Sequence, residues 1–299
     1  MDASFFDRRN YPTASAAKGY GEWAATYEET VAAGLDEPLL AAVTSIDWPA
    51  IDRAADLACG TGRAGAWMTA RGVKVIDGID LTPEMLALAE KRGVYGHLGV
   101  ADVAATGLPA AAYRLCTMIL ADEHLATLPP AYREASRLLQ AGGRFLLVGY
   151  HPYFLMNGLI THFHRPDGAA VTIQSYVHQL SDHFAAGRAC GLSLIEFREC
   201  VIDEAWLETK PKWRPHLNWP VSFALVWEKP YPPRRREHRG VGIAGRGRLA
   251  ARRFLAVAKA RQAESVPHLH QRAGECGDQR VVVEKARSGY PPPHATGKR

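Results

Sequence analysis

The sequence predicts an α/β fold with a seven-stranded, mostly parallel sheet, an antiparallel strand at one edge, and helices on both faces. Two observations predict it. Between residues 54 and 227, short apolar runs alternate with helix-like segments, which is typical of strand–helix units stacked into a parallel sheet. The last two apolar runs have no helix of sufficient length between them, so we expect an antiparallel pair at the sheet edge.

The predicted elements follow one another regularly along the chain. Strands are expected at 53–58, 73–80, 96–101, 115–120, 144–149, 193–198 and 221–227. Helices are expected between them at 62–71, 83–92, 130–140 and 175–189. Gly142 and Gly143 are expected to end the helix 130–140, because glycine tolerates the left-handed conformation that helix ends commonly need.

A helical cap is expected before the sheet, over about residues 14–45. A helix predicted over 14–33 carries Tyr20, Trp23 and Tyr27 at spacings of three, four and seven residues, which places them on one face. Such an aromatic face serves either for packing or for covering a ligand. We expect this helix to cap the ligand-binding edge of the sheet.

Charge divides the chain into two unlike segments. Residues 1–230 hold 20 Lys+Arg and 26 Asp+Glu, a net charge of −6, and residues 231–299 hold 16 and 5, a net charge of +11, which together give the chain's +5. We therefore expect a domain over 1–230 and a basic, Pro/Gly/Arg-rich, disordered tail over 231–299. Electrostatic binding to nucleic acid or to an anionic membrane surface is considered for this tail alone.

Composition also bears on the compartment. No apolar run approaches the roughly 20 residues of a membrane-spanning helix, and the first residues do not resemble a secretory leader. The five cysteines are widely spaced and form no CxxC pair, so neither a disulfide framework nor a zinc site is indicated. We expect a cytoplasmic protein without a membrane span, and the sequence leaves its oligomeric state open.

A glycine-rich turn follows the first predicted strand of the sheet. Gly60 and Gly62 permit a tight turn that brings a ligand close to the backbone, and Gly65 completes a GxGxxG pattern. That pattern alone also occurs in dinucleotide-binding proteins. Three acids add to it, because Asp56 lies in the first strand and Asp80 and Asp102 end the next two.

The position of one of these acids indicates a ribose site. Asp80 lies eighteen residues after Gly62, where a carboxylate accepts hydrogen bonds from both hydroxyls of a ribose. The carboxyl ends of parallel strands meet at one edge of a sheet, so the acids are expected to share that edge.

These stretches resemble the class I S-adenosylmethionine-dependent methyltransferases, of the small-molecule group that includes the ubiquinone-biosynthesis type. The resemblance covers about residues 15–229 and rests on 56–62, 78–86, 101–102, 122–125 and 133–143. It implies a Rossmann-like fold, a glycine turn that holds the methionine part of the cofactor, Asp80 on the ribose and Asp102 on the adenine amino group. Ala58 stands where the family usually has glycine, and Tyr113-Arg114 replaces the usual aromatic-Asp pair.

The resemblance also implies a set of cofactor-binding residues and an aromatic lid over the cofactor. The lid residues are Tyr20 and Tyr27. The full set of expected cofactor-binding residues is Tyr20, Tyr27, Asp56, Ala58, Gly60, Gly62, Asp80, Leu81, Asp102 and Val103.

Two histidines follow predicted strands and are candidates for a general base. His124 and His151 lie just after strands whose carboxyl ends face the ligand edge, and imidazole exchanges protons near neutral pH. His162 and His164 share a face if extended, but no carboxylate or CxxC at fixed spacing supports a metal site. The insertion 151–174 is expected to wall the acceptor pocket.

The sequence thus predicts a methyltransferase that acts on a small-molecule acceptor. Two alternatives stay open: a noncatalytic S-adenosylmethionine- or nucleotide-binding protein that acts on nucleic acid through the basic tail, and an NAD(P)-dependent oxidoreductase. The chemical identity of the acceptor atom is not readable from the sequence.

The tail is predicted to be dispensable for folding. Residues 231–299 lack the apolar density to offset an ordering cost of roughly 1–2 kcal/mol per residue. Truncation after Pro230 should leave the melting temperature and methyl transfer unchanged, as measured by thermal unfolding and turnover of the shortened chain. A large drop in melting temperature would show that the tail packs on the domain.

Overall fold

The computed structural model describes residues 1–31 and 34–232. The tail predicted over 231–299 lies outside the described residues from 233 onward, so the predictions made for it stay predictions. Within the described part, every helix is too short or too polar to cross a lipid bilayer.

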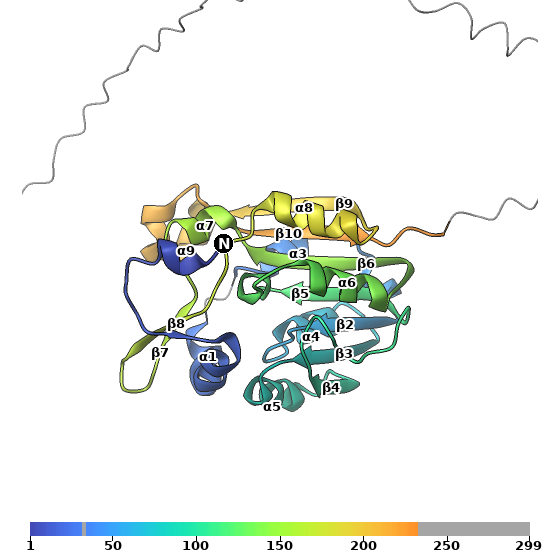
Figure 1. The fold of residues 1–299 in the computed structure, drawn as a ribbon, viewed down its shortest axis with the longest axis horizontal. Helices are drawn as coiled ribbons and strands as arrows, with labels where there is room; N and C mark the ends of the chain where they lie inside the picture. The colour runs from blue at the N-terminus through green and yellow to red at the C-terminus, as the bar shows by residue number, and fades with distance from the viewer. Residues whose placement is uncertain (32–33, 233–299) are drawn as a thin grey trace, which may run out of the picture. The chain divides into compact units, whose positions relative to one another are not determined.

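The core of the fold is a seven-stranded sheet with the strand order β4-β3-β2-β5-β6-β10-β9 (Figure 1). Strands β4 to β6 of this order run parallel, whereas β10 is antiparallel to both of its neighbours. The strands span β2 Arg53–Leu57, β3 Val75–Asp80, β4 His97–Val100, β5 Tyr113–Ile119, β6 Leu139–Tyr150, β9 Ser193–Val201 and β10 Pro220–Glu228. The predicted fold class, including the antiparallel pair, is confirmed.

Helices cover both faces of the sheet because its strands are apolar on both sides. On β5, the alternate residues Cys116 and Met118 pack under α6 and α8, whereas Leu115 faces the opposite way with α3 and α4. These helices and α5 span α3 Glu37–Ala42, α4 Arg63–Thr69, α5 Pro83–Arg92, α6 Pro129–Leu138 and α8 Leu180–Ala189. The two apolar layers fix the sheet edge that carries the site.

Two predicted boundaries are wrong. The helix predicted over 130–140 ends at Leu138, and the two glycines lie inside β6, where the backbone of Gly142 and Gly143 bonds to that of Lys229. The helix predicted over 175–189 begins only at Leu180. Residues before it cannot enter the helix, because the backbone N–H groups of Tyr176 and Val177 bond to the carbonyls of Glu123 and Met1.

The N-terminal cap is more broken than predicted. The expected helix over 14–33 consists of α1 Ala16–Trp23, the 3-10 turn η2 Ala24–Thr26 and α2 Tyr27–Thr30. Its aromatic rings do contact one another, with ring centroids 5.9 Å apart for Tyr20 and Trp23 and 4.9 Å for Trp23 and Tyr27. Trp23 also stacks on Phe163 at 5.5 Å, which gives this ring a packing role.

A second, three-stranded sheet supports the cap and was not predicted. It is ordered β1-β8-β7, from β1 Thr13–Ala14, β8 Ala170–Ile173 and β7 His162–His164. Helix α1 lies against β8 (Figure 1). The remaining elements are η1 Ala3–Phe6, η3 Trp48–Ala50, η4 Asp122–His124, α7 Pro152–Met156, α9 Glu204–Thr209 and η5 Pro211–His216. The insertion 151–174 thus forms α7 and the β7–β8 hairpin.

Candidate functional site

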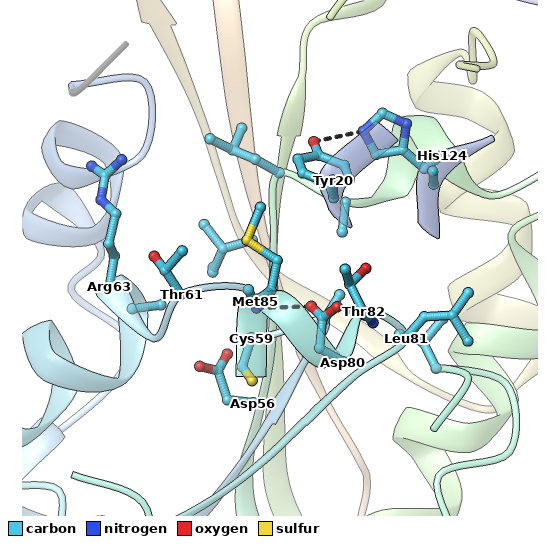
Figure 2. Close-up of a pocket in the computed structure, with 18 of the residues that line it drawn as sticks. Tyr20, Asp56, Cys59, Thr61, Arg63, Asp80, Leu81, Thr82, Met85 and His124 are labelled. Carbon is cyan, nitrogen blue, oxygen red and sulfur yellow. Dashed lines mark hydrogen bonds between the residues drawn. The ribbon is translucent and has the colours of Figure 1, made fainter. Parts of the chain in front are cut away.

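A cleft opens at the carboxyl ends of β2, β3 and β5, with a cavity of about 240 Å³ (Figure 2). Its floor comes from the sheet edge, and its roof comes from α1 and α2 of the N-terminal cap together with η4. Most of the predicted site residues line it: Tyr20, Tyr27, Asp56, Ala58, Gly60, Asp80, Leu81, Asp102, Val103 and His124. Gly62 and His151 were expected here and do not line it.

The glycines of the turn have different roles. Gly60 has φ of 54°, and a Cβ added there would meet nothing within 4 Å, so its missing side chain leaves room in the cleft. Gly62 has φ of 81°, and a Cβ there would lie 2.9 Å from the ring of Tyr95. Gly65 and Gly78 face the same ring. This glycine therefore makes room for Tyr95, and contact of its backbone with a ligand stays a prediction.

Asp56 is held beneath the turn. Its Oδ2 accepts a hydrogen bond from the Tyr95 hydroxyl at 2.8 Å and its Oδ1 accepts one from the Thr117 hydroxyl at 2.7 Å. Burial raises the pKa of Asp56 to about 6. Two residues further along, Ala58 has φ of 54°, which explains why glycine suits this position.

Asp80 joins β3 to the glycine turn. Its Oδ2 accepts a hydrogen bond from the Gly60 N–H and its Oδ1 accepts one from the Thr82 N–H, both at 2.8 Å. Figure 2 shows the carboxylate at the cleft floor, and its burial raises the pKa of Asp80. Because an ionised carboxylate accepts up to about four hydrogen bonds, Asp80 retains capacity for hydroxyl donors of a ligand.

The roof contains a hydrogen-bonded pair of side chains. The His124 Nδ1 lies 2.8 Å from the carbonyl oxygen of Gln174, which can only accept, so Nδ1 carries the proton. The other ring nitrogen, Nε2, accepts from the Tyr20 hydroxyl at 2.9 Å (Figure 2). Burial lowers the pKa of His124. The imidazole is therefore neutral near pH 7, and the lone pair on Nε2 accepts the hydrogen bond of the Tyr20 hydroxyl.

A set of polar contacts ties the roof to the turn. The Glu28 carboxylate in α2 accepts from the Thr61 hydroxyl and, at 2.8 Å, from Arg92 Nη2. Arg92 Nε also donates to the Thr61 carbonyl at 2.6 Å. Sequence reasoning missed these residues, because three distant segments meet here without a motif that links them. It also missed Arg63 at the cleft wall, although this residue directly follows the glycine turn.

His151 lies away from the cleft. Its Nε2 is 3.0 Å from Glu199 Oε1, and its Nδ1 accepts from the Tyr153 N–H at 3.2 Å, so the ring caps α7. In β7, the rings of His162 and His164 lie 5.8 Å apart, on one face as expected. Among residues 1–31 and 34–232, no group of three His, Cys, Asp or Glu side chains is arranged to hold a metal ion.

Part of this chain matches a known protein family. Residues 55–147 match the family model described as a methyltransferase domain. A malonyl-acyl-carrier-protein O-methyltransferase from Serratia marcescens is 34% identical over 91 residues, 30% of this chain and 35% of that protein. The chain thus matches only about a third of this relative's length.

Solved structures show the same fold at lower identity. An S-adenosylmethionine-dependent methyltransferase from Mesorhizobium loti is 20% identical with a TM-score of 0.53, over 65% of this chain and all of that one. A chain from a complex containing the Haloferax volcanii Trm112 methyltransferase activator is 18% identical with a TM-score of 0.55, over 73% of this chain and 99% of that one.

The parallel sheet, the glycine turn and the strand-end acids define a class of α/β proteins that bind a nucleoside-containing ligand at the sheet's carboxyl edge. Within that class, residues 55–147 match the methyltransferase-domain family, and the chain has the fold of solved S-adenosylmethionine-dependent methyltransferases. S-adenosylmethionine is the cofactor of the family.

A comparison of two glycines with similar backbone conformations distinguishes loss of ligand contact from backbone strain. Gly60 and Gly93 have φ of 54° and 64°, and a Cβ at either meets nothing within 4 Å, but only Gly60 lines the cleft. Gly60→Ala and Gly93→Ala should each cost about 1–2 kcal/mol of stability through the left-handed conformation. Only Gly60→Ala should weaken S-adenosylmethionine binding, by roughly tenfold or more. Calorimetric titration and denaturant unfolding measure both effects, and equal affinities for the two variants would contradict the assignment of Gly60 to the ligand.

Proposed function

We propose that this chain transfers a methyl group from S-adenosylmethionine to a small-molecule acceptor. The observation that carries the proposal is that one cleft joins the Gly60–Asp80 edge of the sheet to the Tyr20–His124 pair of the roof. The first part suits a nucleoside-containing cofactor. The second offers a neutral base in a buried setting.

The cleft residues fit the cofactor by their chemistry. Asp80 would accept the ribose hydroxyls, and Asp102 and Val103 would border the adenine, with Leu81 beside them. The open space at Gly60 and the cationic Arg63 suit the methionine part with its carboxylate. When bound, S-adenosylmethionine supplies a methyl group on a positively charged sulfur.

A small acceptor is favoured by the way the cleft is roofed. Tyr20 and Tyr27 come from the cap and are partly buried, and the contact of Glu28 with Arg92 holds the cap on the turn. Small-molecule sites are concave and bury most of the ligand surface. The Serratia marcescens relative takes, by its name, an acceptor carried on a protein, so a carrier-bound small molecule is the form to test beside the free one.

The residues of the roof would position the acceptor and accept its proton. His124 Nε2 is unprotonated and lies at the cleft, so it can take a proton from an acceptor that displaces the Tyr20 hydroxyl. The Gln174 carbonyl holds Nδ1–H throughout and fixes the ring. Orientation and exclusion of water supply the rest of the rate.

Replacing Asp80 tests the cofactor assignment. Asp80→Ala should weaken binding of S-adenosylmethionine and of its demethylated product by about 1.5–3 kcal/mol, the range for a hydrogen bond to a charged group. The parent chain should not bind NAD. Calorimetry that finds unchanged affinity in the variant would overturn the assignment. Tight binding of NAD to the parent would also overturn it and would favour the NAD(P)-dependent oxidoreductase instead.

The two histidines differ in their expected effect on turnover. Once a screen of metabolites has found an acceptor, His124→Ala should lower turnover at saturating substrate by about 10²–10⁴-fold, as loss of a positioned base does. His151→Ala is the matched control, because this ring caps α7 outside the cleft and should leave turnover near the parental value. Parental turnover and an unchanged pH profile in His124→Ala would exclude this residue as the base.

A further inference from the structure

A buried carboxyl group lies directly behind the roof of the cleft. Glu123 in η4 is 1% exposed, and neither of its oxygens makes a hydrogen bond of acceptable geometry. Its Oε1 is 3.5 Å from His124 Nε2, the same nitrogen that accepts from the Tyr20 hydroxyl. His124, which lines the cleft, is thus the side chain that connects Glu123 to it.

The groups around Glu123 do not compensate a negative charge. They are Asp122 and His124 in its own element, the hydroxyl of Thr161, and the phenols contributed by α1, α2 and β6, which are Tyr20, Tyr27 and Tyr150. Among the described residues, no Lys or Arg forms an ion pair with it. Burial, and next the Asp122 carboxylate, raise the pKa of Glu123 well above its usual value.

A carboxyl in this setting holds a proton when the cleft is empty. An unpaired buried carboxylate is so costly that the group neutralises instead. The charge that would reverse this is a cation in the cleft beside Tyr20. The cofactor of this family brings one on its sulfur, and it loses that charge when the methyl group leaves.

We propose that Glu123 releases its proton when the cationic cofactor enters the cleft, and that the carboxylate so formed, paired with His124, receives the proton of the acceptor's nucleophile. The inference rests on the proposed function and narrows it. The acceptor would be an amine or a hydroxyl, which gives up a proton on methylation. An already ionised carboxylate acceptor brings no proton and would be repelled by Glu123.

The protons and charges balance over one cycle. Cofactor binding sends one proton from Glu123 to solvent, so that a carboxylate accompanies the cation. The nucleophile forms a bond to the methyl carbon while the carbon–sulfur bond breaks, and the electron pair of the broken bond stays on sulfur. The proton of the nucleophile moves to His124 Nε2. That proton then passes to Glu123 Oε1, 3.5 Å away. The Glu123 carboxyl group is then neutral again, as it was before binding, and the sulfur beside it is also neutral.

Proton release on binding tests this without any acceptor. S-adenosylmethionine and S-adenosylhomocysteine share their amino and carboxyl groups and differ in the charge on sulfur. Calorimetric titrations at pH 7, in two buffers of different ionisation enthalpy, count the protons released. The parent should release about one proton more with S-adenosylmethionine than with S-adenosylhomocysteine, because one coupled carboxyl changes state.

Two glutamine variants make the assignment specific. Glu123→Gln should still bind S-adenosylmethionine but lose this proton difference. It should melt no lower than the parent, because an amide replaces a protonated carboxyl of the same shape. Glu199→Gln is the matched control, since Glu199 pairs with a histidine that lies outside the cleft. It should release protons as the parent does.

The outcomes separate this inference from the proposed function. No binding of either nucleoside would refute the proposed function itself. Binding with equal proton release for the two nucleosides in the parent, or an undiminished difference in Glu123→Gln, would overturn the role of Glu123 alone. If Glu123→Gln does not fold, the comparison of the two nucleosides in the parent still decides.

Discussion

The packing of one tyrosine against three glycines is the constraint on which the site depends. The ring of Tyr95 occupies the space that side chains at Gly62, Gly65 and Gly78 would take, and its hydroxyl bonds to Asp56. Strand β2, the turn, helix α4 and strand β3 are thereby held against a single side chain. Because protein interiors are close-packed, none of the three positions tolerates a Cβ without movement of the ring. The turn keeps its shape on this side, which leaves its other side free for a ligand.

Polar contacts with the glycine turn hold the roof in position. Thr61 and Arg92 bind Glu28 and so fix α2, and the aromatic cluster of the cap carries that position on to Tyr20, whose hydroxyl meets His124. Floor and roof therefore share one support, although they come from segments far apart in the sequence. A change at the turn is expected to reach the acceptor side as well as the cofactor side.

The sequence was sufficient for the floor of the site and insufficient for its roof. Strand ends can be read from apolar runs, and parallel strands deliver Asp80 and Asp102 to one edge. The same reasoning placed His151 at that edge but had no means to tell which way its ring turns. Glycine spacing shows where a Cβ is absent without showing whether Tyr95 or a ligand fills the space. Strands as short as Thr13–Ala14 carry no periodic signal, and nothing in the residues beside Glu123 reveals its burial.

The small sheet has a consequence for the order in which the protein is made. Thr13 pairs with Thr172, so β1 leaves the ribosome about 160 residues before the strand that it pairs with. Strands β2 to β5, with the glycine turn, are complete well before residues 170–173 are synthesised. Closing so long a loop costs chain entropy that only the finished cap offsets. The nucleoside-binding floor of a nascent chain is therefore formed in an open state, and enclosure of the cleft is a late event of biosynthesis.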